Sequence, residues 1–192
     1  MRAAGEATRE RILGAARLLF GERGYEHTSI EEVLDASGVT RGALYHHFPS
    51  KTALFDAVLE AVVADLAARA SSEAHGGGAP ANLRAGARSW MAMAREPAVQ
   101  RIYLLDPQAA VGWARWRELD ERYWLGGLRA SFAKLAEEGR VPRGQEQFLA
   151  YMLCAALTEA ALFIAHARNQ AAAAEVAQEG VDLLLDRLLA SD

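Results

Sequence analysis

Side chains that can bind phosphate gather in one segment near the start of this 192-residue chain. Between Asp35 and Asp56 the sequence contains no acidic residue, although the whole chain has a formal net charge of -4. Arginine, lysine, histidine and tyrosine donate hydrogen bonds to phosphate oxygens, and arginine also reads base edges. The segment is therefore a candidate surface for nucleic acid, and its donors are Arg41, Tyr45, His46, His47 and Lys51.

The distribution of charge supports this interpretation better than the total does. Residues 1–51 carry seven basic and seven acidic side chains, whereas residues 52–192 carry fourteen basic and eighteen acidic ones. The acidic excess lies outside the opening segment, so the net charge does not exclude a nucleic-acid partner there. The acidic remainder argues against a protein that coats DNA without regard to sequence.

The helix before the donor-rich segment has two possible starts. Thr28-x-x-Glu31 and Ser29-x-x-Glu32 both fit a capping box, in which a hydroxyl and a carboxylate satisfy free backbone amides reciprocally. The helix is expected to end at Gly38, because glycine tolerates the left-handed conformation that closes many helices.

A second short helix is expected to follow almost at once. Thr40 is a good N-cap, which leaves only Gly38 and Val39 as the turn. Pro49 ends this helix, and Ser50 caps a longer one. Two short helices joined by a tight, glycine-containing turn form a helix-turn-helix, whose second helix enters the major groove of DNA.

The remainder predicts an all-α fold of about nine helices, rich in alanine and leucine and poor in β-branched residues. We expect helices over residues 8–23 (stopped by Gly21 and Gly24), 51–70, 81–96, 97–105, 109–138, 145–169 and 171–190, with no strand and no internal repeat. A kink is expected at Gly126-Gly127. The sequence suggests a helix-turn-helix DNA-binding domain at 1–51 and a helical effector-binding and dimerisation domain at 52–192, with a low-complexity loop at Gly76-Gly77-Gly78.

Location is suggested by what the sequence lacks. The single cysteine, Cys154, cannot form an internal disulfide, and nothing looks like a secretory signal, so a cytoplasmic protein is expected. Residues 148–167 are about long enough to cross a membrane. Because Glu159 would be costly in lipid, we expect a helix buried in a protein core or a dimer interface, and no membrane partner.

Order, spacing and helix punctuation in the first third of the chain together resemble the tetracycline-repressor (TetR) family of bacterial transcriptional regulators. The resemblance rests on Ala16…Phe20-x-x-x-Gly24-Tyr25, Thr28-Ser29-Ile30-Glu31-Glu32-Val33, residues 36–48, and Ser50-Lys51 with Leu54. Leu34 departs from it, since the family commonly has alanine there. The resemblance implies a homodimer whose helical body binds a small molecule. Binding then releases the two N-terminal helix-turn-helix domains (the heads) from palindromic double-stranded operator DNA. The resemblance therefore implies a repressor.

The predicted DNA contacts are divided between reading and anchoring. Arg41 is the best candidate for bonding guanine bidentately, with a phosphate contact as the alternative, and Ala43 could touch a thymine methyl. By resemblance, Tyr45 binds phosphate and Lys51 clamps it. His46 is a candidate base reader and His47 a phosphate ligand; adjacent helical residues point apart, so the pair does not predict a metal site, and no cofactor is expected. The full predicted set is Thr28, Thr40, Arg41, Gly42, Ala43, Tyr45, His46, His47 and Lys51.

The body has aromatic and soft side chains that line either an effector pocket or the core. Trp113 and Trp116 are favoured for the pocket because a polar handle, Arg117, lies on the same predicted helix. Cys154 is expected to be buried and inert. The predicted ligand-binding set is Trp90, Met93, Trp113, Trp116, Arg117, Tyr123, Tyr151, Phe163 and His166.

The last two predicted helices are the expected dimer interface, with an intramolecular core as the alternative. The apolar residues assigned to that interface are Leu149, Leu153, Leu157, Leu162, Val181, Leu184, Leu185 and Leu188. A competing function is a small helical enzyme or carrier for an apolar or aromatic molecule. The sequence contains no phosphate loop, metal spacing or nucleophile–base signature, so we expect no catalysis.

Overall fold

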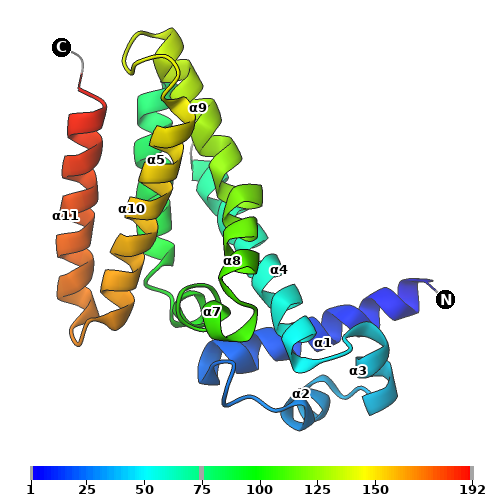
Figure 1. Cartoon of the computed structure of the whole chain (residues 1–192). Coiled ribbons are helices and arrows are strands. Elements are labelled where there is room, and N and C mark those ends of the chain that lie inside the picture. Colours follow the sequence, from blue (N-terminus) through cyan, green and yellow to red (C-terminus); the bar gives the residue numbers. More distant parts are fainter. Residues whose placement is uncertain (1, 74–75, 191–192) are drawn as a thin grey trace. The chain divides into compact units, whose positions relative to one another are not determined.

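The computed structural model describes residues 2–73 and 76–190, and within them it contains helices and no strand (Figure 1). The predicted all-α fold is confirmed. The elements are α1 Arg2–Arg23, α2 Ile30–Ser37, α3 Arg41–His47, α4 Lys51–Glu73, α5 Gly78–Met93, α6 Pro97–Val99, the π-helical η1 Gln100–Leu105, α7 Pro107–Ala110, α8 Trp113–Asp120, the π-helical η2 Glu121–Leu125, α9 Gly126–Glu137, α10 Glu146–His166 and α11 Gln170–Leu188.

The chain forms two compact units that do not follow its order. The first contains the residues up to Val62 together with Pro97–Trp116, and the second contains Val63–Glu96 together with the residues from Arg117 onward. Residues 52–62 and 97–116 therefore pack with the N-terminal helices rather than with the other helices of the body. The functional division at residues 51 and 52 stays a prediction. Part of the predicted loop around Gly76-Gly77-Gly78, residues 74–75, lies outside the described residues.

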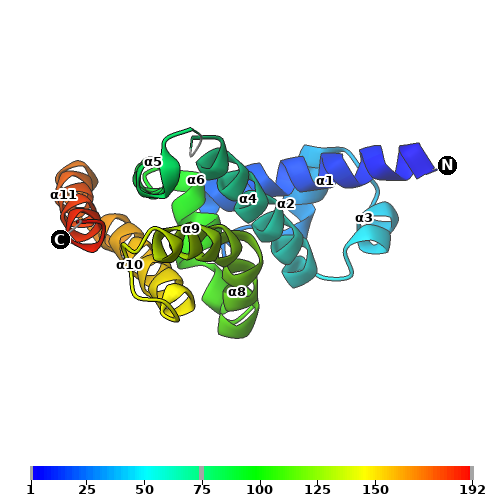
Figure 2. The ribbon, with the colours of Figure 1, turned by 90° about the horizontal axis from the view of Figure 1, so that it is seen from above.

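The first unit is built on α1, against which α2 and α3 lie (Figure 2). Ile12, Ala16 and Phe20 recur at helical spacing and are fully buried. The Phe20 and Phe55 rings meet edge to face at a centroid distance of 5.1 Å. Tyr25 completes the group, 5.0 Å from Phe55. This aromatic cluster joins the end of α1 to the first turns of α4.

Gly21 does not end α1 as the sequence suggested; the helix continues to Arg23. The absence of a side chain at Gly21 serves packing instead, because an added Cβ would lie 2.9 Å from the Ala98 Cβ atom. Gly24 is the terminator, with φ +81° and its amide donating to the Phe20 carbonyl at 2.9 Å.

The segment from Pro97 to Asp106 docks on this end of α1. The backbone N–H of Tyr25 donates to Asp106 Oδ2 at 2.6 Å. A Cβ atom added at Gly24 would lie 2.9 Å from the same oxygen. Position 24 therefore needs a left-handed backbone and room for the Asp106 carboxylate, and glycine meets both needs.

Replacing Gly24 with alanine is expected to lower the free energy of unfolding by at least about 1–2 kcal/mol, because an L side chain is strained in the left-handed region. The measurement is the urea midpoint of the full chain, followed by circular dichroism at fixed protein concentration. Gly14→Ala is the matched control. It lies within α1 with no atom near its added Cβ, so it should stabilise by about 0.5–1 kcal/mol. A Gly24→Ala midpoint at or above that of wild type would contradict the prediction.

In the second unit, α10 lies beside α5, α9 and α11. Trp90 of α5 is buried, and its Nε1 donates to the Leu157 carbonyl of α10 at 3.0 Å. One helix among the described residues, α10, is long and apolar enough to cross a membrane by length and composition. Of its most apolar 18-residue window, 33% is buried in the protein.

The helix predicted over residues 109–138 is interrupted twice. Gly112, with φ +84°, separates α7 from α8, so the long helical run begins at Trp113. The π-helical turn η2 then inserts wider hydrogen bonding just before Gly126-Gly127, where the sequence suggested a kink. In the same way, the helix predicted over 97–105 is α6 followed by η1.

Candidate nucleic-acid interface

Ser29, not Thr28, begins the first helix of the motif. Its hydroxyl accepts from the Glu32 amide at 3.2 Å, and Glu32 Oε2 accepts from the Ser29 amide at 2.8 Å. These hydrogen bonds form a complete capping box and hold the pKa of Glu32 below its usual value, with the Ser29 amide as the largest cause. Of the two starts that the sequence allowed, the structure selects the second.

Thr28 is poorly placed for the DNA contact that the sequence predicted. Its side chain is only 2% exposed, and its hydroxyl donates to the Gly24 carbonyl at 2.9 Å. The hydroxyl is therefore committed to the loop between α1 and α2. Serine ranks only somewhat above threonine as an N-cap, and both positions fit the sequence motif. The packing of Thr28 against α1 decides between them.

The turn between α2 and α3 has the predicted geometry. Gly38 is left-handed, with φ +62°, and its amide donates to the Leu34 carbonyl at 2.9 Å. Arg11, which the sequence analysis did not single out, reaches from α1 to this turn. Its Nη2 donates to the Ser37 carbonyl at 2.6 Å and to the Gly38 carbonyl at 3.1 Å. Arg11 thus satisfies carbonyls that the end of α2 leaves free.

Thr40 caps α3 as predicted, since its Oγ1 accepts from the Ala43 amide at 3.3 Å. Leu44 is fully buried and Phe48 is 3% exposed, so both anchor the helix inward. The opposite side presents most of the predicted contacts to solvent. Arg41, Gly42, Tyr45 and His46 are exposed there, and Ala43 and His47 are half-buried.

Lys51 lies at the first turn of α4, half-buried beside Tyr25. Its Nζ is 4.3 Å from the Tyr25 ring centroid, and it donates to the Glu26 carbonyl at 3.4 Å. Ser50 caps α4, because its Oγ accepts from the Ala53 amide at 3.0 Å. The phosphate clamp assigned to Lys51 stays a prediction, and the cation–π contact would hold the ammonium in place for it.

The predicted ligand-binding residues are divided between the two compact units. Trp113 and Trp116 belong to the first: Trp116 Nε1 donates to the Tyr103 carbonyl at 3.0 Å, while Trp113 is 57% exposed. Within the second unit, Trp90 and Met93 are core side chains, 5% and 2% exposed. The sequence left open whether Trp90 and Met93 line a pocket or the core, and their burial fits the core.

Phe163 and His166 lie on the outer side of α10. Phe163 is 55% exposed, and His166 is also exposed, with its Nδ1 2.9 Å from the Leu162 carbonyl. This exposure does not favour a pocket for either residue, and their predicted role stays untested. The sequence shows that this helix is apolar without showing which side of it faces the core.

Arg117 and Tyr151 do come together, in a polar cluster that the sequence only partly indicated. Arg129 donates to the Tyr151 hydroxyl at 3.1 Å and forms an ion pair with Glu121, while the Tyr151 hydroxyl donates to Glu121 at 2.6 Å. The Arg117 guanidinium lies 5.8 Å from the Tyr151 ring. The hydrogen bonds from Tyr151 and then Arg129 lower the pKa of Glu121. Tyr123, also on η2, is half-buried.

Two donors near this cluster are buried without an acceptor among the described residues: Trp124 Nε1 and Arg129 Nε. The Trp124 ring packs edge to face on Trp90 at 5.3 Å. Unpaired buried donors are costly, so this part of the body has unused hydrogen-bonding capacity. Cys154 is buried as predicted, and burial raises the pKa of its thiol to about 12.

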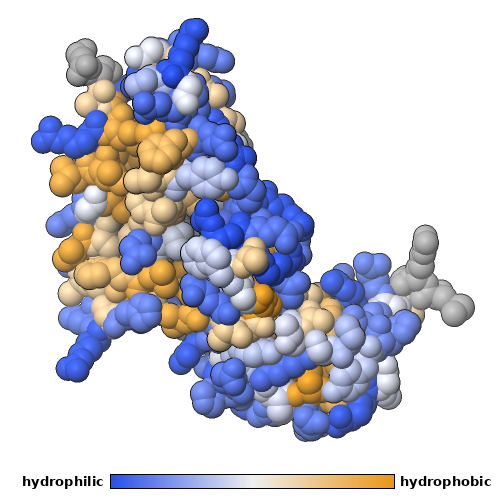
Figure 3. Space-filling view, in the orientation of Figure 1, coloured by the Kyte–Doolittle hydropathy of each residue, from blue (hydrophilic) through white to orange (hydrophobic). Residues whose placement is uncertain are grey.

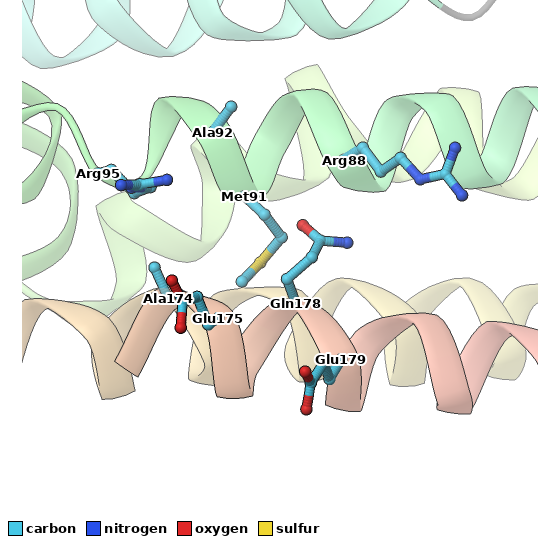
Figure 4. Close-up of a pocket in the computed structure, with 8 residues that line it drawn as sticks. All are labelled: Arg88, Met91, Ala92, Arg95, Ala174, Glu175, Gln178 and Glu179. Carbon is cyan, nitrogen blue, oxygen red and sulfur yellow. The ribbon is translucent and has the colours of Figure 1, made fainter. Parts of the chain in front are cut away.

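A shallow pocket of about 360 Å³ lies between α5 and α11 (Figure 4). It contains none of the predicted ligand-binding residues. Its lining residues are Arg88, Met91 and Ala92 from α5, Arg95 just beyond the end of α5, and Ala174, Glu175, Gln178 and Glu179 from α11. Within residues 2–73 and 76–190, no group of three or more histidine, cysteine or acidic residues is placed to hold a metal ion.

Among the large apolar residues that are exposed on the last two helices, only Leu184 belongs to the set that the sequence favoured. Leu153, Leu157, Val181 and Leu185 are buried within the single chain. Hydrophobic surface nevertheless gathers over α10 and α11 (Figure 3). The exposed large apolar side chains there are Phe148, Met152, Phe163, Val176, Leu183 and Leu184.

A helical fold with a capped helix-turn-helix and a donor-rich second helix defines the class of DNA-binding transcriptional regulators. Residues 12–58 match the family model described as bacterial regulatory proteins, tetR family. Residues 80–188 match the model described as tetracyclin repressor-like, C-terminal domain. The fold is similar to the crystal structure of a tetR-family transcriptional regulator from Pectobacterium atrosepticum, whose sequence is 33% identical to this chain. The match covers 100% of this chain and 98% of that protein's chain, with a TM-score of 0.87.

Two curated relatives match shorter stretches. The HTH-type transcriptional repressor Rv1474c of Mycobacterium tuberculosis is 37% identical over 109 residues, 56% of this chain and 57% of that protein. The HTH-type transcriptional repressor KstR2 of Rhodococcus jostii is 41% identical over 58 residues, 30% of this chain and 28% of that protein. The matched part of the chain thus spans between about a quarter and three fifths of the length of these curated relatives. Because both family models match this chain and the Pectobacterium protein is similar over its whole length, the chain belongs to the tetR family of bacterial regulatory proteins. Membership of this family favours a DNA-binding regulator over the enzyme or carrier alternative.

Proposed function

We propose that this protein is a cytoplasmic, homodimeric repressor without catalytic activity, released from a palindromic operator by a small molecule. The observation that carries the DNA-binding part is the exposed side of α3, where Arg41, Tyr45 and His46 project from a helix held by the Thr40 cap and the buried Leu44. In a helix-turn-helix the second helix enters the major groove, and its N-terminal residues meet base edges.

The dimer is proposed to form through the outward sides of α10 and α11. Their six exposed apolar side chains form a patch of the kind that marks protein interfaces. In an isologous dimer the same patch meets itself about a two-fold axis, so the operator should have matching two-fold symmetry. Two heads would then enter major grooves about 34–36 Å apart.

The effector is proposed to bind in the helical body. Support comes from the polar cluster of Arg117, Glu121, Arg129 and Tyr151, and from the unpaired buried donor of Trp124. A ligand that carries a hydrogen-bond acceptor would complement such donors. Ligand binding releases DNA only if the ligand prefers one arrangement of the two heads over another.

The test is selection of bound sequences from random duplex DNA by the full-length protein. The proposal expects a palindrome with half-sites one helical turn apart, bound at least about a thousandfold more tightly than random duplex at matched salt. Small molecules that co-purify with the protein are then titrated into the complex. Equal affinity for the selected site and for random DNA would refute sequence-specific regulation.

Arg41→Ala is expected to weaken operator binding by about 1–3 kcal/mol and to relax preference at one position of each half-site. The reason is the loss of a bidentate hydrogen bond to guanine. Fluorescence anisotropy with operator variants substituted one base pair at a time measures both effects. Arg17→Ala, which changes the same charge on the exposed surface of α1, should leave the preference at every position unchanged. An unaltered base preference in Arg41→Ala would assign Arg41 to phosphate instead.

A further inference from the structure

Arg41 is held by an acidic residue of the preceding helix. Its Nη2 donates to Glu31 Oε1 at 2.7 Å, and both side chains are more than half exposed. Tyr45, one turn further along α3, also interacts with the guanidinium. The hydrogen bond from Arg41 lowers the pKa of Glu31, so the carboxylate is ionised at neutral pH. The residue best placed to read a base is therefore already oriented.

Glu31 forms neither of the capping-box hydrogen bonds of α2, unlike its neighbour. Glu32 accepts hydrogen bonds from the Ser29 amide and hydroxyl at the start of the helix, and it forms an ion pair with Arg23. Glu31 instead points to Arg41. An exposed carboxylate beside a DNA-contacting helix repels phosphates and weakens binding to any sequence. Its one described side-chain partner is the guanidinium of Arg41.

The pair leaves Arg41 with donors to spare. A guanidinium carries five N–H donors, and the hydrogen bond to Glu31 occupies one of them. Two others suffice for guanine O6 and N7. An unrestrained arginine would lose more side-chain entropy on reaching that geometry, and it could equally take a nearby phosphate.

We infer that Glu31 is a specificity-determining residue of the DNA-binding surface: it positions Arg41 for a base edge and repels phosphate, lowering affinity for all DNA while raising discrimination. The inference rests on the proposed function, since it concerns how the same surface chooses its site. Glu31 acts through Arg41 and contacts no base itself.

The experiment compares wild type and Glu31→Gln as full-length proteins, with anisotropy measured on the selected operator and on random duplex over a series of salt concentrations. Glu31→Gln should bind random DNA several-fold more tightly, with a salt slope steeper by about 1, because the freed guanidinium can take a phosphate. The ratio of random to operator Kd should fall about tenfold. Most of that fall should occur at the base pair that Arg41→Ala identifies.

Asp35→Asn is the matched control, because it removes one exposed carboxylate from the same helix. It should shift binding to both DNAs alike and leave the ratio unchanged. In an Arg41→Ala background, Glu31→Gln should no longer alter base preference. An unchanged ratio in Glu31→Gln, or a change matched by Asp35→Asn, overturns the inference while wild-type operator binding still upholds the proposed function. A wild type that does not distinguish operator from random DNA overturns both.

Discussion

Replacing Phe163 with glutamate is expected to dissociate the proposed dimer into monomers and to abolish tight binding to the proposed palindromic operator. Phe163 is 55% exposed and lies on the outward side of α10, in line with Met152, eleven residues earlier. Eleven residues are close to three helical turns, so the two side chains share one stripe. Val176 and Leu183, seven residues apart, form a second stripe on α11.

The expected magnitude follows from symmetry. Loss of a central aromatic residue from an interface costs about 2 kcal/mol or more, and burial of an unpaired carboxylate adds to that cost. An isologous interface contains each substitution twice, so the dimer should lose about 4 kcal/mol of binding free energy. Its dissociation constant should therefore rise about a thousandfold. Operator affinity should fall as well, because a monomer holds only one half-site.

Sedimentation velocity over a range of protein concentrations measures the dissociation constant, and anisotropy on the operator follows the loss of binding. Leu18→Glu is the matched control for dimerisation, because Leu18 is 67% exposed on α1 and lies outside the proposed interface. It should leave the dimer intact. A Phe163→Glu protein that sediments as wild type would place the dimer interface elsewhere.

The second large effect is expected at the centre of the first compact unit. Phe55→Ala should lower the free energy of unfolding by about 3–5 kcal/mol, since the side chain is fully buried and its removal leaves a cavity. It also removes two edge-to-face contacts, with Phe20 and with Tyr25. Because this cluster joins α1 to α4, the loss of stability should fall on the first compact unit.

Urea unfolding monitored by circular dichroism should show an earlier transition in Phe55→Ala, and operator binding should be lost at temperatures that wild type tolerates. Dimerisation should persist, because its proposed determinants lie on α10 and α11. Phe55→Leu keeps most of the volume and should lose roughly 1–2 kcal/mol. If the alanine and leucine variants unfold at the wild-type midpoint, the aromatic cluster does not support the fold.

The helix-turn-helix could be predicted residue by residue because its determinants are local. A hydroxyl before a helix, a carboxylate three residues later and a glycine at the end act within one turn of backbone, and Ser29, Gly38 and Thr40 all have the predicted roles. The choice of Ser29 over Thr28 was not local. It depended on the burial of Thr28 against α1.

The body could be predicted as helical but not as a set of faces. The alanine- and leucine-rich composition made α10 and α11 apolar on most sides, so periodicity did not separate the side that packs in the chain from the side that faces outward. Leu153 and Leu185 are core, while Phe163 and Leu184 face solvent. Likewise, nothing local indicated that residues 97–116 pack with the N-terminal helices.

The donor-rich segment shows the same division at one residue. The sequence by itself determined that Arg41 would begin a capped helix, because caps and turns are encoded within a few residues. Only the tertiary structure decided that Glu31, ten positions earlier, holds its guanidinium. That hydrogen bond depends on the angle between two helices, which follows from how α1, α2 and α3 pack together.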